Sequence, residues 1–195
     1  LLVTKGRSDL RMLPEGRWGQ LMLLGLLFYA LTQGASFVAL AYLPAVTVNL
    51  IWNFSSITVA LMGMIWLSEH PTRLQWAGTL IALLGAVTYF VPVTIPGSHI
   101  LGLVVAVVGV LANAASSILG RAVNRTLATH PRVVTTVSMG TGSIALLAVG
   151  IGLEGIPSID IKGWAIILWL AVVNTAFAFT LWNKTLQTLT AVESS

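Results

Sequence analysis

Six long apolar stretches dominate the sequence, and each is free of charged residues except close to its ends. They cover roughly residues 18–40, 43–67, 75–92, 100–120, 133–153 and 164–183. A helix that crosses a bilayer needs about 20 mostly apolar residues, and a charge at the bilayer centre costs about 2.5–3.5 kcal/mol on insertion scales. The uninterrupted runs are too long for barrel strands of about 10 alternating residues. The sequence therefore predicts an all-α, polytopic transmembrane helix bundle with about six helices.

Composition supports the same class. Only 8% of the 195 residues are charged, whereas a soluble domain carries about a quarter. The chain has no cysteine, so it offers neither a thiolate nucleophile nor a Cys-ligated metal. Its three histidines are expected in loops, and none belongs to an H-E-x-x-H zinc motif. We therefore predict no catalytic residue, no metal site and no cofactor.

The basic residues indicate how the chain sits in the membrane. If residues 1–17 are cytoplasmic, nine of the ten Lys and Arg residues lie inside and only Lys162 lies outside. This bias is the usual signature of cytoplasmic loops. The sequence thus predicts a multi-pass protein of the plasma (inner) membrane. The loops expected in the cytoplasm are 1–17, 68–74, 121–132 and 184–191.

The positions of the basic residues also indicate which partners to expect. The basic residues are spread over four loops rather than gathered in one patch, so the net charge of +4 is expected to report topology and not a nucleic-acid partner. The expected partners are the lipid bilayer and a small-molecule substrate. The sequence leaves the oligomeric state open.

The stretch "LSEHPTRLQ" between the second and third spans allows two interpretations. Its acid, imidazole, hydroxyl and guanidinium could form a catalytic cluster, but a turn between helices is favoured. Thr72 and Gln75 form a T-x-x-Q capping box, and Pro71 ends the preceding helix. Arg73 marks the cytoplasmic side, and Glu69 is placed near a helix N-terminus that favours an anion. Whether Glu69 also latches a gate stays open.

An internal repeat is suggested by a shift of 146 positions. Residues 18–49 and 164–195 then share seven identities without gaps, including Trp18 with Trp164. Five helices separate corresponding elements, and an odd number inverts the second copy. Inverted repeats of this kind characterise secondary transporters.

The repeat length also predicts the organisation of the chain. Two units would make about ten helices, so we expect this chain to be an internal piece holding helices three to eight. Two helices would precede Leu1 and two would follow Ser195. The first expected unit, 1–92, holds the end of helix two and helices three to five. The second, 100–195, holds helices six to eight and the start of helix nine.

Residues 39–90 resemble the EamA-type transporters of the drug/metabolite transporter superfamily. The matching motifs are A-x-x-Y-L-P-A at Ala39–Ala45, L-x-E at Leu67–Glu69, Thr72, and Q-x-x-G-x-x-L-I-x-x-x-G from Gln75 to Gly85. The second half resembles the family's second repeat, with Gly120-Arg121 and "LTAV". The chain departs from the family at Ser68, where Gly is common, and in lacking a Pro between Leu50 and Leu67.

The resemblance implies a ten-helix bundle with both termini in the cytoplasm and a central cavity. It also implies movement of small metabolites, often export of amino acids or related compounds. Polar and aromatic span residues are candidates for lining the pathway, with Asn49, Asn53 and Ser56 on one helical face. The full predicted set is Gln33, Ser36, Asn49, Trp52, Asn53, Ser56, Asn113, Ser117 and Asn174. Helix packing is the alternative role for each of them.

These features together predict a function. No span carries a mid-membrane Asp, Glu, Lys or Arg, so the expected cargo is neutral or zwitterionic. The expected protein is a secondary transporter that works by alternating access and is not an enzyme. A non-transporting scaffold or an intramembrane enzyme is the alternative. The sequon-like triplets at Asn124 and Asn183 are set aside because they fall at expected cytoplasmic helix ends.

Overall fold

The computed structural model describes residues 15–89, 99–125 and 130–189, and within these ranges the regular elements are all helical. Long apolar segments become helices in a membrane because a helix satisfies its backbone hydrogen bonds internally. In chain order the elements are α2 (Glu15–Gly25), η1 (Leu26–Thr32), α3 (Gln33–Tyr42), α4 (Ala45–Trp52), α5 (Phe54–Trp66), α6 (Arg73–Tyr89), α7 (Ile100–Arg125), α8 (Pro131–Glu154), α9 (Ile161–Trp169), η3 (Leu170–Phe177) and α10 (Ala178–Thr185).

Five of the described helical segments are long and apolar enough to cross a membrane. They are Gly16–Tyr42, Ala45–Trp66, Ile100–Arg125, Pro131–Glu154 and Ile161–Thr185. The sixth predicted span, 75–92, corresponds to α6, of which 17 residues are described. The predicted all-α polytopic bundle is confirmed. Several helices extend a few residues past their predicted limits, and the longest extension is that of α7, which continues to Arg125 and so places Arg121 inside a helix.

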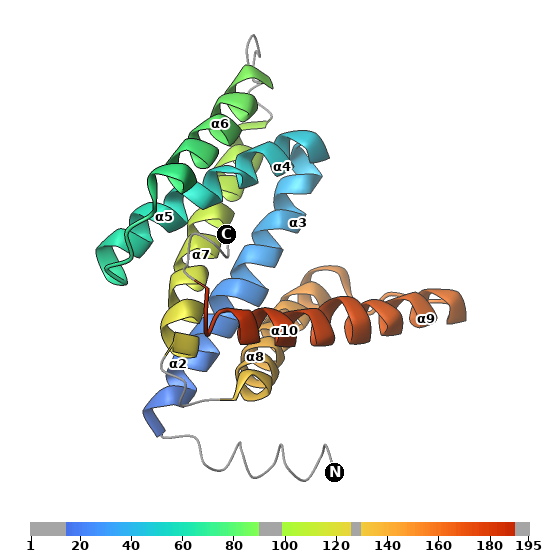
Figure 1. Ribbon diagram of the computed structural model, residues 1–195. Helices are drawn as coiled ribbons and strands as arrows, with labels where there is room; N and C mark the ends of the chain where they lie inside the picture. The colour runs from blue at the N-terminus through green and yellow to red at the C-terminus, as the bar shows by residue number, and fades with distance from the viewer. Residues whose placement is uncertain (1–14, 90–98, 126–129, 190–195) are drawn as a thin grey trace.

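Helix α7 is the centre of the bundle. It packs against α2, η1, α3, α4, α5 and α10, and Figure 1 shows it running between the blue and the green helices. Small residues on α7 allow this close packing, because Ala106 and Ala114 are fully buried. Ala106 packs with residues of α3 and α4, and Ala114 packs with Val59 of α5.

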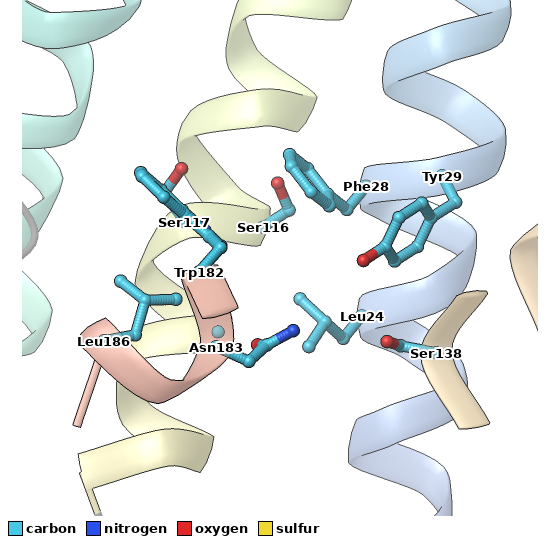
Figure 2. A pocket seen from close by; sticks show the side chains of 10 residues that line it. Leu24, Phe28, Tyr29, Ser116, Ser117, Ser138, Trp182, Asn183 and Leu186 are labelled. Carbon is cyan, nitrogen blue, oxygen red and sulfur yellow. The ribbon is translucent and has the colours of Figure 1, made fainter. Parts of the chain in front are cut away.

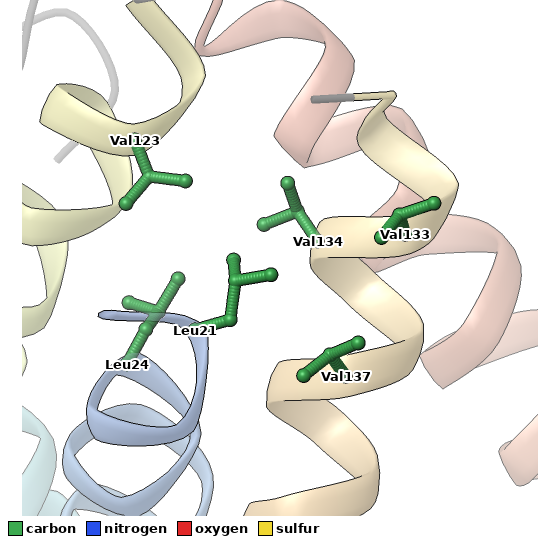
Figure 3. Packing of buried hydrophobic residues seen from close by; sticks show 6 residues of the cluster. All are labelled: Leu21, Leu24, Val123, Val133, Val134 and Val137. Carbon is green, nitrogen blue, oxygen red and sulfur yellow. The ribbon is translucent and has the colours of Figure 1, made fainter. Parts of the chain in front are cut away.

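A second apolar cluster joins α2, α7 and α8. Its buried members are Leu21, Leu24, Val123, Val133, Val134 and Val137 (Figure 3). Helices α2 and α8 also touch through two glycines, one on each helix. A Cβ atom on Gly25 would overlap the backbone carbonyl of Ser138, and one on Gly142 would overlap the carbonyl of Gly25. Only glycine permits this approach of the two backbones.

The segment α9–η3–α10 joins the bundle through its last part. Helix α10 packs against α8 and α7, whereas α9 and η3 have no buried residue. Figure 1 shows α9 extending away from the other helices. The end of α10 near Asn183 and Leu186 is therefore the part of this span that can contribute to a site inside the bundle.

The chain departs from regular α geometry at three places. The chain is π-helical in η1 and again in η3, and in each a Thr hydroxyl donates to a carbonyl five residues earlier, Thr32 to Leu27 at 2.8 Å and Thr175 to Leu170 at 2.9 Å. Asn53 separates α4 from α5, and its side chain donates to the Asn49 carbonyl at 3.4 Å. This span is thus interrupted although it has no proline between Leu50 and Leu67.

Candidate functional site

A small cavity lies among α2, η1, α7, α8 and the end of α10 (Figure 2). Its volume is about 20 Å³, which holds about one water molecule. Polar groups share the wall with aromatic rings. The lining residues are Leu24, Phe28, Tyr29, Ser116, Ser117, Gly120, Ser138, Trp182, Asn183 and Leu186.

Three aromatic rings form one wall beside this cavity. Phe28 and Tyr29 come from η1 and Phe179 from α10, with ring centroids 5.0–5.5 Å apart in edge-to-face arrangements. Such pairs contribute about 0.5–1.5 kcal/mol each beyond the burial of their area. The Tyr29 side chain also interacts with that of Ser138. The aromatic contacts therefore hold the start of α10 against η1.

A buried ion pair contacts one of the residues that line the cavity. Arg121 of α7 donates from Nε to Glu69 Oε1 at 3.1 Å, and both side chains are about nine-tenths buried. A second nitrogen of Arg121, Nη1, donates to the backbone carbonyl of Leu186, a lining residue. Arg125 also approaches Glu69, at 4.0 Å, but its side chain is 57% exposed. Arg121 therefore links the turn after α5 to the end of α10.

Amide and hydroxyl side chains form a hydrogen-bond network among α7, α8 and α10. Asn124 Nδ2 donates to Asn183 Oδ1 at 2.9 Å and to the Gly120 carbonyl at 2.8 Å. Asn183 in turn donates to Thr135 Oγ1 of α8 at 3.1 Å. We call Glu69, Arg121, Asn124, Thr135 and Asn183 the buried polar layer. It joins the turn after α5 with α7, α8 and α10.

One acceptor in this layer has no hydrogen-bond partner among the described residues. It is Oδ1 of Asn124, a residue that is 1% exposed. Buried polar atoms are nearly always hydrogen bonded, so this oxygen calls for a donor. Asn124 is bonded to Gly120 and Asn183, which both line the cavity. A water or a ligand with an N–H or O–H group would supply the missing bond.

The turn that delivers Glu69 has an unusual backbone. Ser68 has φ of +52°, in the left-handed region that favours glycine. Both neighbours of Ser68, Leu67 and Glu69, donate their backbone N–H to the carbonyl of Gly63, at 3.0 and 3.2 Å. The chain thus folds back at the end of α5 and turns Glu69 toward α7. A glycine at this position would adopt this φ value without strain.

The capping box predicted for the next helix is present. The Thr72 N–H donates to Gln75 Oε1 at 2.7 Å, and the Gln75 N–H donates to Thr72 Oγ1 at 3.3 Å. Thr72 and Arg73 are exposed and Pro71 is half-buried. These contacts support the interpretation of the stretch as a helix-to-helix turn. Glu69 also binds Arg121, a role that its expected position near a helix N-terminus does not predict.

The structure distributes the predicted pathway residues over the bundle. Ser117 is the member of the predicted set that lines the cavity. Trp52 packs with the α3–α4–α7 cluster and lies 3.3 Å from the Cβ position of Gly109. The exposed members are Asn49, Asn53 and Asn174. The half-buried members are Gln33, Ser36, Ser56 and Asn113. The assignment of these residues to a pathway stays a prediction.

Sequence reasoning missed most of the buried polar layer. The charge of Arg121 predicts a loop position at the end of a span, yet α7 continues through this residue. Asn124 and Asn183 attracted notice as sequon positions and not as a contacting pair. A usable signal was present, because Arg121 and Asn124 are three residues apart and so share one face of a helix. The described residues contain no group of three His, Cys, Asp or Glu that could hold a metal.

Comparison with known proteins agrees with this architecture. The sequence profile of the EamA-like transporter family matches residues 1–91 and 100–195. No curated protein and no solved structure matches the sequence. The family match covers nearly the whole chain, and the helices are those of a multi-pass membrane protein. The chain therefore belongs to the EamA-like transporter family.

Proposed function

We propose that the protein is a secondary transporter of the plasma membrane that moves small neutral or zwitterionic metabolites, such as amino acids or related compounds, in the direction of export. The observation that carries this proposal is the match to a transporter family over two blocks that together cover nearly the whole chain. The five apolar helices are consistent with it, because each is long and apolar enough to cross a membrane.

The chemistry around the cavity supports a neutral or zwitterionic cargo. Serine hydroxyls, an amide and aromatic rings face it, and these groups bind polar molecules without requiring a net charge. The charged pair next to the cavity, Glu69 with Arg121, is neutral as a pair.

An alternating-access mechanism is supported by the positions of the two π-helical segments. The shift of 146 residues that relates the expected repeats moves η1, Leu26–Thr32, onto residues 172–178, which overlap η3 at Leu170–Phe177. Interrupted helices at corresponding positions of two repeats are a feature of secondary transporters, and π-segments often mark functional sites. We therefore propose that the units 1–92 and 100–195 belong to two inverted repeats that move relative to each other.

The decisive experiment is a flux measurement. The protein, in the form in which the cell makes it, is reconstituted in lipid vesicles and offered a panel of labelled amino acids and related metabolites, with and without a proton gradient. We expect uptake above empty vesicles for at least one neutral or zwitterionic compound. A best cargo with a strong net charge would contradict the cargo class. Absence of flux over the whole panel would favour the scaffold or intramembrane-enzyme alternative.

A further inference from the structure

The buried polar layer contains two kinds of contact, and they differ in which halves of the chain they join. Asn124, Thr135 and Asn183 all belong to the unit 100–195, so their hydrogen bonds stay within it. The Glu69–Arg121 pair instead joins residues 52 positions apart, one from each unit. Among the described residues, Glu69 forms ion pairs with Arg121 and Arg125, and both pairs cross between the units.

The position of this pair relates it to one end of the cavity. Gly120 and Leu186 line the cavity, and Arg121 follows the first in sequence and binds the carbonyl of the second. The same end of the bundle carries Arg17, Arg125, Arg132 and Lys184, and the positive-inside rule places such an end in the cytoplasm. Arg121 therefore lies between the cavity and the cytoplasmic surface.

We propose that Glu69 and Arg121 form a latch that closes the cytoplasmic end of the cavity, and that this end opens only when the pair separates. The inference rests on the proposed transport function, because it assigns one step of alternating access to a named contact. A contact that crosses two moving units on the cytoplasmic side must break when that side opens. Contacts within one unit, such as Asn124 with Asn183, stay intact during the same movement.

The physical character of the pair suits a latch. Two charges that are about nine-tenths buried are expensive to leave without a partner, so the closed state is favoured as long as both are present. The cavity is too small for a metabolite, which agrees with a closed state. When the end opens, water can reach both side chains, and hydration then replaces the lost contact.

These 195 residues contain no cysteine, so, with any cysteine outside them replaced by serine, a single reporter thiol allows a direct test that does not depend on the identity of the cargo. A single reporter, Ser117→Cys, places a thiol on the cavity wall. Its reaction with a membrane-impermeant methanethiosulfonate reagent is timed in inside-out and right-side-out vesicles. We expect Glu69→Gln to raise the labelling rate by about tenfold in inside-out vesicles, because the open population rises when one charge is removed. No comparable rise is expected in right-side-out vesicles.

Further variants separate a latch from a general loss of structure. Glu69→Gln leaves Arg121 buried without a counter-charge, so Glu69→Gln/Arg121→Gln, which removes both charges, is measured as well and should also raise labelling. The exchanged pair Glu69→Arg/Arg121→Glu should restore labelling toward the original rate. Arg132→Gln, which removes an exposed charge at the same end, should leave the rate unchanged.

A second reporter detects unfolding. Ala106→Cys lies in the fully buried α3–α4–α7 cluster, away from the cavity. Increased labelling at position 117 with none at 106, and its reversal in the exchanged pair, would support the latch. Unchanged labelling at 117 in both charge-removing variants, or an equal rise at both reporters, would overturn it. Labelling needs no flux, so the latch can fail while transport is observed, and transport can fail while the latch is observed.

Discussion

At the scale of single residues, Ser68 and Asn183 show how local chemistry positions the site. Ser68 adopts a positive φ that turns Glu69 toward Arg121. Asn183 is almost completely buried and is hydrogen bonded to Asn124, Thr135 and the Phe179 carbonyl. In both cases the role of a small polar residue depends on contacts that its neighbours in sequence do not indicate.

Replacing Ser68 by glycine should stabilise the protein. The left-handed conformation costs an L-residue about 1–2 kcal/mol, and the greater freedom of glycine in the unfolded chain offsets part of the gain. We expect a net gain of about 0.5–1 kcal/mol for Ser68→Gly, seen as a higher melting temperature in detergent. Ser56→Gly, inside helix α5, is the matched control and should lower it. A lower melting temperature for Ser68→Gly would contradict the account.

Removing the Asn183 amide should destabilise the protein. Asn183→Ala removes a partner of Asn124 and of Thr135 inside the bundle, and we expect a loss of about 1–2 kcal/mol. Asn174→Ala is the matched control, because Asn174 lies in the same span but is exposed. Thermal unfolding of the two purified variants compares them. Equal melting temperatures would show that the amide network contributes nothing measurable.

At the scale of helices, packing between α2 and α8 depends on glycine at two positions. The backbones approach so closely at Gly25 and Gly142 that neither position has room for a methyl group. This contact and the nearby valine cluster fix α8 beside α2, and Ser138, one turn before Gly142, then faces the cavity. Gly142 therefore has a packing role that its neighbour Gly140 does not share.

Two glycines on α8 provide a matched test of this packing. Gly142→Ala should cost at least about 1–3 kcal/mol, because the added methyl overlaps Gly25 and Tyr29. Gly140→Ala meets nothing within 4 Å, so its higher helix propensity should leave stability unchanged or raise it by up to about 1 kcal/mol. Melting curves of both variants decide the question. Similar melting temperatures would show that α2 and α8 do not pack in this way.

At the scale of the whole molecule, α7 joins both halves of the chain. It packs against every helical segment from α2 to α5 and also against α10. Its C-terminal end carries Arg121 and Asn124, so the helix that organises the bundle also organises the buried polar layer. The basic residues predict that this end of the assembly faces the cytoplasm.

That orientation predicts opposite labelling at the two ends of α8. Arg132 and Ser158 are exposed on either side of this span. Single cysteines at these positions should react with an impermeant thiol reagent from opposite faces, Arg132→Cys in inside-out vesicles and Ser158→Cys in right-side-out vesicles. The cysteine-free parent is the control. Reaction of both from the same face would overturn the assignment of α8 as a span.

The sequence alone determined the class of the protein and much of its local structure. Apolar length and the lack of internal charge determine spans, because each span meets the lipid individually. The capping box is also local, since its two residues are three positions apart and both of its bonds form. The family motifs lie in the same local stretches, and they identified the family that the profile match then showed.

Only the tertiary structure decided which polar residues meet inside the bundle. The Arg121–Glu69 and Asn124–Asn183 contacts join residues 52 and 59 positions apart. Such contacts depend on how helices rotate about their axes and on how closely glycine lets them approach, and neither quantity is encoded in one helix. A charge near a span end looks the same in sequence whether it faces water or a buried partner. The packing of α7 against α5 and α10 makes that choice for Arg121.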